Sequence, residues 1–353
     1  MAYTTIDDPS LYHQTVTYTG NGSSQSINFD GNSDMQPDML WTKSRGDNSD
    51  PIIRDSQRGI GNRLLVHATD GEGGATGTTA FNSDGFSLDS TGTVNANSQT
   101  FVAWGWKANG GTETNSQSES GSQIACSVQA NTTAGFSIIT YTGTGGTGHT
   151  FLHGLGSTPA WFIIKRRSGT EDWLVYHHKN TSDPATDYLL LNTTDATVDS
   201  ATRFDDTSPN STEIACGNNA VINGDGSTYV CWAWKEVQGF SKFGSYTGNG
   251  NADGAFVYTG FKPAWIILKR SSSTGNWLMY DNKRDIDNEA LSYLVANTND
   301  AESTAANGID LLSNGFKIRR TGVSWNNSGD SYIYMAFAEH PFVSSKGVPV
   351  TAR

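Results

Sequence analysis

The stretch Pro159-Ala-Trp-Phe-Ile-Ile-Lys165 decides the fold, because it occurs a second time, nearly unchanged, as Pro263-Ala-Trp-Ile-Ile-Leu-Lys269. A weaker third copy is Pro37-Asp-Met-Leu-Trp-Thr-Lys43. In each copy a run of mostly apolar or aromatic residues separates a proline from a lysine. Such a run predicts a buried β-strand that begins at the proline, where no ladder donor is needed, and ends in water at the lysine.

Four further landmarks recur around these strands, in the same order each time. A Tyr-Thr-Gly-X-Gly turn precedes the proline, and a polar loop ending in aspartate follows the lysine. An asparagine and an aromatic strand then close each copy. The spacing therefore predicts a tandem array of three repeats. The turns are 18–22, 141–145 and 246–250, the aspartates Asp70, Asp195 and Asp300, the asparagines Asn95, Asn223 and Asn326, and the closing strands 101–106, 229–234 and 332–337.

Composition places a linker between the first two repeats. Residues 108–134 are rich in Gly, Ser and Asn, and Pro37 and Pro159 lie farther apart than Pro159 and Pro263. We therefore predict that repeats two and three pack as a near-rigid pair, with repeat one placed more independently. The predicted segments are an N-terminal arm (1–12), repeat one (13–107), the linker (108–134), repeat two (135–236), repeat three (237–340) and a C-terminal tail (341–353).

The hydrophobic pattern indicates an all-β protein. Short apolar runs recur about every 8 to 12 residues between Gly, Asn, Asp or Ser turns, and a convincing helical period is absent. Each repeat is long enough for a two-sheet sandwich whose aromatic strands face inward. We predict three tandem antiparallel β-sandwich repeats of jelly-roll or lectin-like topology.

Charge and hydropathy exclude several classes of partner. Of 353 residues 16% are charged, the net charge is -12, and aromatics make up 11%. Without a basic stripe, we expect neither nucleic acid nor an acidic membrane surface as partner. The sequence lacks the run of about 18 apolar residues that membrane insertion needs. The start, residues 1–8, lacks the features of a signal peptide, so we expect synthesis in a cytoplasm.

Metal-site patterns are weak. His149 and His153 are four apart in a turn and strand, where their side chains would lie about 13 Å apart on one face. His177 and His178 are adjacent, so on a strand they point to opposite faces. Asn223-Gly-Asp-Gly226 resembles a fragment of a calcium loop but lacks the closing glutamate. We predict no metal and no cofactor.

Catalytic patterns are equally weak. A glycosidase needs two carboxylates facing one cleft, and none of the nine glutamates falls on a repeated landmark. Asp70, Asp195 and Asp300 do recur, but a residue repeated three times in a polar loop is more economically a turn former. Nucleophile elbows, phosphate loops and dinucleotide fingerprints are absent from the sequence. We predict that the protein is not an enzyme.

Two other motifs have unremarkable interpretations. Cys126, Cys216 and Cys231 are expected to be free, buried thiols, with a Cys216–Cys231 disulfide as the open alternative. The tripeptide Arg45-Gly-Asp47 matches an integrin-binding motif, but three residues in a polar loop match by chance.

The two ends of the chain carry a family resemblance. Residues 1–10, the Tyr-Thr-Gly-Asn-Gly turns, the segment 332–342 and the ending 347–353 resemble tandem-repeat virion proteins of bacteriophages. Those proteins come mostly from marine and cyanobacterial phages and are described as tail-fibre or structural proteins. The resemblance covers essentially the whole chain. It implies a virion component and supplies no catalytic residues.

The favoured hypothesis is a virion structural protein in a tail fibre or similar appendage, whose aromatic and amide-rich loops bind polysaccharide on the host surface. The alternative is a head-decorating or cementing subunit without a receptor, and a third hypothesis is a polysaccharide depolymerase. Apolar groups at both ends predict contacts with other virion proteins and self-assembly, a trimer by analogy with fibres. These groups are Tyr3, Ile6, Leu11, Phe342, Val348 and Val350. A frayed N-terminal arm is the alternative at residues 1–12.

Overall fold

The structure, a computed structural model, describes residues 2–74 and 76–350, and it is nearly all β with several antiparallel sheets. Three sets of five strands share one spatial order, and we call the chain around each set unit 1, unit 2 and unit 3. In unit 1 the order is β1(His13–Thr19), β8(Thr100–Trp106), β3(Met39–Ser44), β4(Ile52–Asp55), β5(Leu64–Leu65); in unit 2, β11(Phe136–Thr142), β18(Thr228–Trp234), β13(Trp161–Arg166), β14(Leu174–His177), β15(Asp187–Leu190); in unit 3, β19(Ser241–Thr247), β26(Ser331–Pro341), β21(Phe261–Arg270), β22(Trp277–Asp281), β23(Ala290–Val295).

Shorter strands form a second layer in each unit, and a one-turn helix precedes each closing strand. In units 1 and 3 the second layer has three strands, and in unit 2 it has two. Further short elements are η1(Pro9–Leu11), β9(Asn115–Gln117), β10(Cys126–Asn131) and β16(Val198–Asp199). The second-layer strands are β2(Gln25–Ile27), β6(Thr78–Phe81), β7(Phe86–Leu88), then β12(His149–Leu152), β17(Glu213–Cys216), then β20(Phe256–Tyr258), β24(Ser303–Leu312), β25(Gly315–Ile318), and the helices are α1(Gly92–Asn95), α2(Ala220–Asn223), α3(Val323–Asn326).

The proline–lysine strands are buried on both faces. In β13, Trp161 and Ile163 face a core shared by all three units, while Phe162 and Ile164 face a core of unit 2 alone. Strands β3 and β21 alternate in the same way. A strand with apolar neighbours on both faces reads as a continuous apolar run, which is the pattern seen in the sequence. Nine of the ten tryptophans lie in the shared core.

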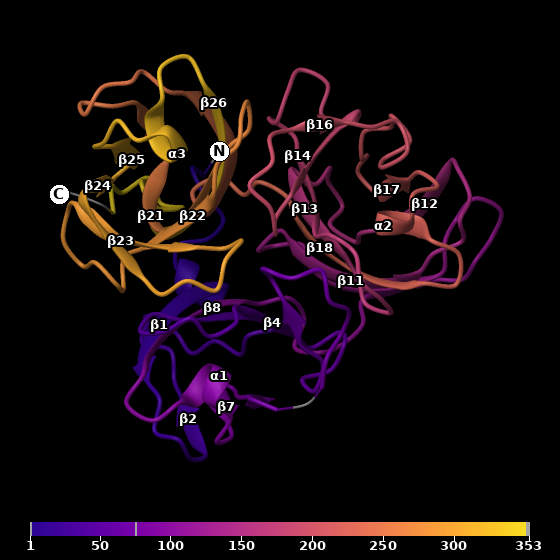
Figure 1. The fold of residues 1–353 in the computed structure, drawn as a ribbon, viewed down its shortest axis with the longest axis horizontal. Helices are drawn as coiled ribbons and strands as arrows, with labels where there is room; N and C mark the ends of the chain where they lie inside the picture. The colour runs from indigo at the N-terminus through magenta and orange to yellow at the C-terminus, as the bar shows by residue number, and fades with distance from the viewer. Residues whose placement is uncertain (1, 75, 351–353) are drawn as a thin grey trace.

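The three units surround this shared core as three lobes (Figure 1). The prediction that repeat one is placed more independently is therefore wrong, because side chains of unit 1 pack in the same cluster as those of units 2 and 3. Large aromatic rings bury more surface when three sheets cover them than when each sheet faces water.

The sequence analysis predicts that the lysines at the ends of the three strands reach water. This prediction is wrong, because all three lysines are buried. Each Nζ donates to a backbone carbonyl in the loop of another unit, so the contacts run in a closed circle. Burial lowers the pKa of all three ammonium groups to about 8. The bonds join Lys43 to Thr298 (2.7 Å), Lys165 to Thr69 (2.8 Å) and Lys269 to Thr194 (2.9 Å).

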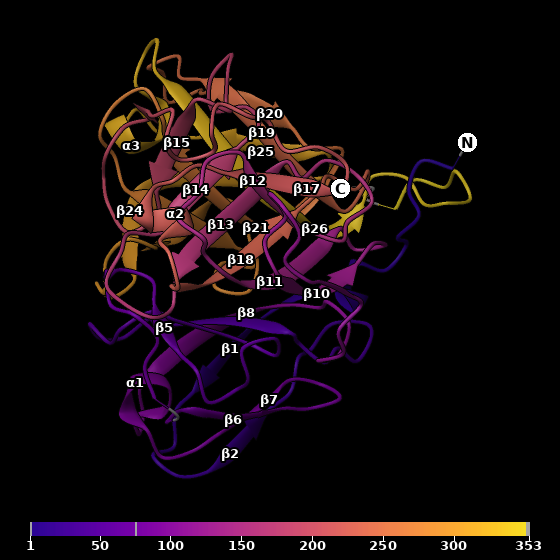
Figure 2. The ribbon, with the colours of Figure 1, turned by 90° about the vertical axis from the view of Figure 1, so that its right-hand side faces the viewer.

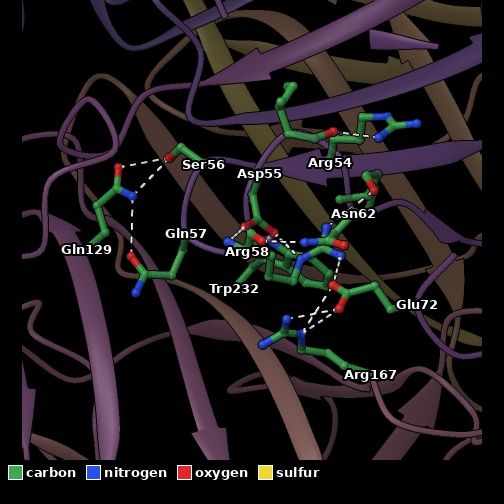
Figure 3. A network of polar contacts seen from close by, with 12 residues as sticks. Arg54, Asp55, Ser56, Gln57, Arg58, Asn62, Glu72, Gln129, Arg167 and Trp232 are labelled. Atoms are coloured by element: carbon green, nitrogen blue, oxygen red, sulfur yellow. Dashed lines mark hydrogen bonds and ion pairs between the residues drawn. The ribbon is translucent and has the colours of Figure 1, made fainter. Parts of the chain in front are cut away.

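Unit 2 contacts unit 1 through a buried chain of charges (Figure 3). Asp55 pairs with Arg58 at 2.6 Å and accepts a hydrogen bond from Nε1 of Trp232 at 3.0 Å. Glu72 lies 2.8 Å from Arg58 and 2.9 Å from Arg167 of unit 2, so it links the two arginines. Every charge in this chain therefore has an opposite partner, which a buried ion needs to be tolerated.

Unit 1 contacts unit 3 through the same arrangement. Asp281 pairs with Arg284 at 2.6 Å and accepts from Nε1 of Trp104 at 3.1 Å. Glu302 lies 3.1 Å from Arg284 and 2.8 Å from Arg45 of unit 1, so it links the two arginines. Glu72 and Glu302 follow the loop aspartates at the same distance along the chain, a repeat that the list of landmarks does not include.

The contact of unit 3 with unit 2 has neutral groups in place of this chain of charges. His177 occupies the place of the interface aspartates, since it pairs with Trp161 as Asp281 pairs with Trp265. Its Nε2 lies 3.2 Å from the carbonyl oxygen of Tyr334. The hydroxyl of Thr197 donates to Asn180 at 2.7 Å where the other contacts have a glutamate and an arginine. At the positions of the aspartate, arginine and glutamate, unit 2 thus has His177, Asn180 and Thr197.

Residues 108–134, predicted to be a linker, form part of the fold. They contain β9 and β10, and β10 pairs with β11. The segment is fixed to unit 1 by the buried carboxylate of Asp38, which accepts from the backbone nitrogens of Ala108, Gly110 and Gly111 at 2.8–2.9 Å. A Gly- and Ser-rich composition does not prevent order here, because a buried carboxylate satisfies the backbone donors.

The N-terminal arm lies beside the loop that precedes the C-terminal end of the chain (Figure 2). The backbone nitrogen of Ser345 donates to Asp7 at 2.6 Å, and Tyr3 donates to the carbonyl of Gly260 at 2.8 Å. Ile6 is buried in the shared core, whereas Leu11, Val348 and Val350 are exposed. The N-terminal arm therefore packs on its own chain. Met1 and residues 351–353 of the predicted arm and tail lie outside the described residues.

Candidate binding site

The repeated asparagines are structural. Asn326 is fully buried, its Oδ1 accepts from the nitrogen of Asn249 at 2.9 Å, and its Nδ2 donates to the carbonyl of Asn251 at 2.7 Å. Asn95 and Asn223 bind the corresponding turns of units 1 and 2 in the same way. Each buried amide thus satisfies its own polar atoms by bonding to the backbone of a turn that lies at the surface. These landmarks hold the turn against the closing helix and form no ligand site.

The repeated aspartates lie near the buried lysines. Asp70, Asp195 and Asp300 act through their negative charges on the lysines of the neighbouring units, and each raises the pKa of its lysine against the larger effect of burial. Their common role is electrostatic support of the contacts between units.

The histidines have separate partners. Nδ1 of His149 lies 2.7 Å from Oγ1 of Thr144, and Nε2 of His153 lies 3.2 Å from the carbonyl of Asn210. His178 contacts the carbonyl of Phe243 at 2.8 Å, so both it and His177 lie in the contact between units 2 and 3. Within residues 2–74 and 76–350, three or more potential ligands do not gather where they could hold a metal ion.

The remaining motifs are also engaged in the fold. Arg45 of the Arg-Gly-Asp tripeptide is paired with Glu302 of unit 3. Cys126, Cys216 and Cys231 are free and buried, and burial raises the pKa of each thiol. Asn223 of the calcium-like fragment is the structural asparagine of unit 2.

A pair of exposed aromatic side chains stands out on unit 3. Phe256 and Tyr258 lie two residues apart on β20, an edge strand, and are 48% and 55% exposed. Val257 between them is buried, so both rings stand on the outer face, about 6.6 Å apart along the strand. Large exposed aromatics that do not pack in a core are typical of binding surfaces.

Charged side chains surround this pair. Lys317 lies directly opposite Phe256 on β25, and Asp310 lies opposite Lys317 on β24. Asp253 contacts Lys317, and it lies 3.5 Å from Arg319. We name Phe256, Tyr258, Asp310, Leu312 and Lys317 the outer face of unit 3, because their cross-strand pairing places them on one side of the sheet.

The outer face leads into an open cleft of about 640 Å³. Leu312 belongs to both, since it also lines the cleft. The lining also includes Ile286, which is 82% exposed, and Val350 near the C-terminus. Polar lining comes from Lys262, Asp285, Asp287, Glu339 and His340, among other residues. The surface therefore continues from the exposed rings to a polar groove.

Units 1 and 2 lack the aromatic pair. Ile27 in unit 1 and Phe151 in unit 2 correspond to the buried Val257 of unit 3. The neighbours that correspond to Phe256 and Tyr258 are therefore Ser26 and Asn28 in unit 1, and Thr150 and Leu152 in unit 2. Because the rings are exposed, packing does not explain them. The sequence analysis predicts that aromatic strands face inward, and it does not identify this exposed pair; aligning the three second-layer strands would have revealed it.

Among the described residues, the helices are too short or too polar to cross a membrane.

These features define an all-β protein made of three corresponding units around a tryptophan core, with one exposed aromatic face. The chain belongs to the family described as "Domain of unknown function (DUF7483)", whose model matches residues 8–341. A search of curated proteins and a search of solved structures each found no match. The family model thus covers all three units as one.

Proposed function

We propose that this protein is a non-enzymatic virion component, part of a tail fibre or similar appendage, that contributes to attachment to polysaccharide on the host surface. The observation that carries the proposal is the outer face of unit 3, where two exposed rings stand beside Lys317 and Asp310. The apolar face of a sugar ring packs on an aromatic ring, and its hydroxyls bond to charged side chains. The resemblance of the chain to phage virion proteins supports the location.

The proposal includes the finer architecture. Each unit is treated as a β-sandwich repeat, since its apolar residues lie between the five-strand sheet and the shorter second layer. In unit 1 the first and last strands are neighbours in one sheet, and the second and seventh are neighbours in the other. Jelly rolls, a fold that lectins use, also pair these early and late strands, which supports this finer proposal, although β3, β4 and β5 here follow one another in a single sheet.

The depolymerase hypothesis would draw on the carboxylates of the same face. Burial raises the pKa of Asp310, while hydrogen bonding to Lys317 lowers the pKa of Asp253. A difference of this kind is typical of acid and base pairs. Here, however, Arg319 lies within 3.6 Å of both carboxylates. Ion pairing suits a role in binding, so we keep hydrolysis as an outcome of the test.

The test measures binding of the purified protein to immobilised surface polysaccharide of host cells. We expect Phe256→Ala and Tyr258→Ala each to weaken binding at least about tenfold, which corresponds to about 1.4 kcal/mol. Val323→Ala is the matched control, since Val323 is also exposed on unit 3 but lies outside the outer face. Equal binding by all three variants would contradict the proposal, and release of reducing ends by the wild type would favour a depolymerase.

Immunogold labelling of virions tests the location. Label on tail appendages is expected. Label on the head would favour the decorating or cementing subunit, for which the exposed Val348 and Val350 would supply contacts to neighbouring proteins.

A further inference from the structure

The first strand of each unit, β1, β11 or β19, lies at one end of the five-strand order, so one of its edges can pair outside the five. In an antiparallel pair alternate residues bond to the partner strand, and those between direct their N–H and carbonyl groups to the other edge. The nitrogen of Lys107 donates to the carbonyl of Tyr12 at the start of β1, so Thr15 is of the second kind. Ile138 and Phe243 hold the same place in units 2 and 3, because they pair with the corresponding residues of the closing strands.

The outward groups of Ile138 and Phe243 are covered. In unit 2 the additional strand β10 lies along the edge, with Gln129 opposite Ile138. In unit 3 the nitrogen of Phe243 donates to Oε1 of Glu236 at 3.0 Å, and Nε2 of His178 lies 2.8 Å from the carbonyl oxygen of Phe243. A strand of the chain thus covers this edge in unit 2, and side chains cover it in unit 3.

The edge of β1 borders a pocket instead. Within residues 2–74 and 76–350, the outward backbone groups of Thr15 have no hydrogen-bond partner, and its buried hydroxyl has none either. Backbone groups of a buried residue are normally bonded, and an unpaired strand edge is a template for another strand. The pocket has a volume of about 150 Å³, and its lining includes His13, Gln14 and Thr15 of unit 1 and Ala264, Asn282 and Glu339 of unit 3.

The wall of this pocket on unit 3 corresponds to the wall that holds β10 on unit 1. Ser56 follows the interface aspartate Asp55, and its hydroxyl accepts from the amide of Gln129 at 2.9 Å. Asn282 follows Asp281 in the same way and lines the pocket. Corresponding walls therefore enclose a strand where unit 2 meets unit 1, and a pocket where unit 1 meets unit 3.

We propose that this pocket is a docking site for an extended segment of another protein, which pairs with the free edge of β1 as β10 pairs with β11. The segment runs antiparallel to β1, as β10 does to β11. Main-chain hydrogen bonds to Thr15 supply affinity, and side-chain contacts in the pocket supply specificity.

The pocket also sets the chemistry of the segment. Its acidic and lysine side chains already have opposite partners, so the residue opposite Thr15 should be polar but uncharged, as Gln129 is. The next residue should be small, as Ala130 is, because it lies opposite Gln14, whose amide is held by hydrogen bonds of its own. The charged pairs are Lys283 with Asp30 and Glu339 with Lys262, each at 2.7 Å.

The test selects short random peptides from an mRNA-displayed library on the immobilised wild-type protein. We expect enriched peptides that bind with one-to-one stoichiometry. Each should slow hydrogen exchange at the amide of Thr15, because that N–H becomes part of a ladder. Exchange at Ser245, an outward position on the corresponding strand β19, should stay the same.

Two variants at position 282 separate this pocket from other surfaces. Asn282→His copies His178, whose ring covers the same edge in unit 3, so it should weaken binding of the selected peptides at least about tenfold. Asn282→Ser is the matched control, because it copies Ser56, which lies beside β10. Its binding should stay within about twofold of the wild type.

Thr15→Pro gives an independent check. Proline removes the outward N–H, which the ladder to β8 does not use, and strand edges tolerate proline at such positions. Binding should fall at least about tenfold, whereas Ser245→Pro on β19 should leave it unchanged.

Three results would each overturn the proposal. The first is a selection that enriches no peptide, and the second is equal binding by Asn282→His and Asn282→Ser. The third is unchanged hydrogen exchange at Thr15 when a selected peptide is bound. If Thr15→Pro fails to fold, the two variants at position 282 still decide the question.

Discussion

Burial controls the charge of Lys43, Lys165 and Lys269. Their pKa values in the folded protein are about 8, whereas an unfolded lysine has a pKa of about 10.4. Between these two values the unfolded chain binds more protons than the folded chain. The contribution of each lysine to the free energy of unfolding therefore rises with pH across this range.

We predict that the stability difference between wild type and Lys269→Met grows in favour of the wild type from pH 7 to pH 10. Buried cysteines and tyrosines, whose pKa values are raised, act in the opposite direction, but they are common to both proteins and cancel in the difference. Urea unfolding at several pH values measures it. Lys346→Met, at an exposed position, is the control and should give a constant difference. A constant difference for Lys269→Met would mean that its ammonium group is solvated.

Asn326 shows how much one buried amide supports. Asn326→Ala should lower the free energy of unfolding by about 2 kcal/mol, because the exposed turn at 249–251 would lose two hydrogen bonds to the buried amide, each worth about 1 kcal/mol. Asn28→Ala, at an exposed position, should leave it within about 0.5 kcal/mol. Chemical denaturation of both variants provides the comparison, and equal stability of the two would contradict a structural role for the amide.

At the scale of elements, the two-faced strands explain what the sequence could predict. The runs at 159–165 and 263–269 correspond to β13 and β21, and the all-β class is confirmed. Pro263, expected at a strand start, lies inside β21 at an irregularity of the ladder, which is where a strand tolerates proline. A continuous apolar run shows that both faces are covered but does not show by what. The shared core therefore could not be predicted from the runs alone.

The aromatic outer face of unit 3 could not be recognised in the sequence for a related reason. Phe256 and Tyr258 alternate with a buried valine, as core aromatics do on many strands, and the direction of the alternation is set by pairing with β25. Similarly, the sequence does not distinguish a lysine that bonds to a carbonyl of another unit, as Lys165 does, from a lysine in water. Position relative to a neighbouring unit decides both cases.

The charged contacts between units should be more sensitive than the neutral one. Asp281→Ala leaves Arg284 buried beside Glu302 alone and removes the acceptor of Trp104, so we expect a loss of about 3–5 kcal/mol. His177→Ala, at the corresponding position, removes a neutral group and should cost less. Denaturant titrations at pH 7 compare the two variants. A greater loss for His177→Ala would show that the charge chain is not what holds units 1 and 3 together.

At the scale of the whole molecule, the shared core makes the three units one cooperative body. Residues 109–123 are mostly exposed, so a protease can cut there, but units on both sides of the cut still share tryptophans in one core. We predict that the nicked protein elutes from a size-exclusion column as the intact one does, and that its fragments separate only in denaturant. Release of a C-terminal fragment under native conditions would contradict the shared core.

The single aromatic face also sets the valency of the chain. Three similar units could carry three sites, yet Phe256 and Tyr258 have counterparts such as Ser26 and Thr150 in the other two. If this face binds sugar as proposed, each chain is monovalent, and avidity must come from the number of chains on a particle. The isolated protein should then hold its polysaccharide weakly and release it quickly. A virion would move across a cell surface by exchanging such weak contacts one at a time.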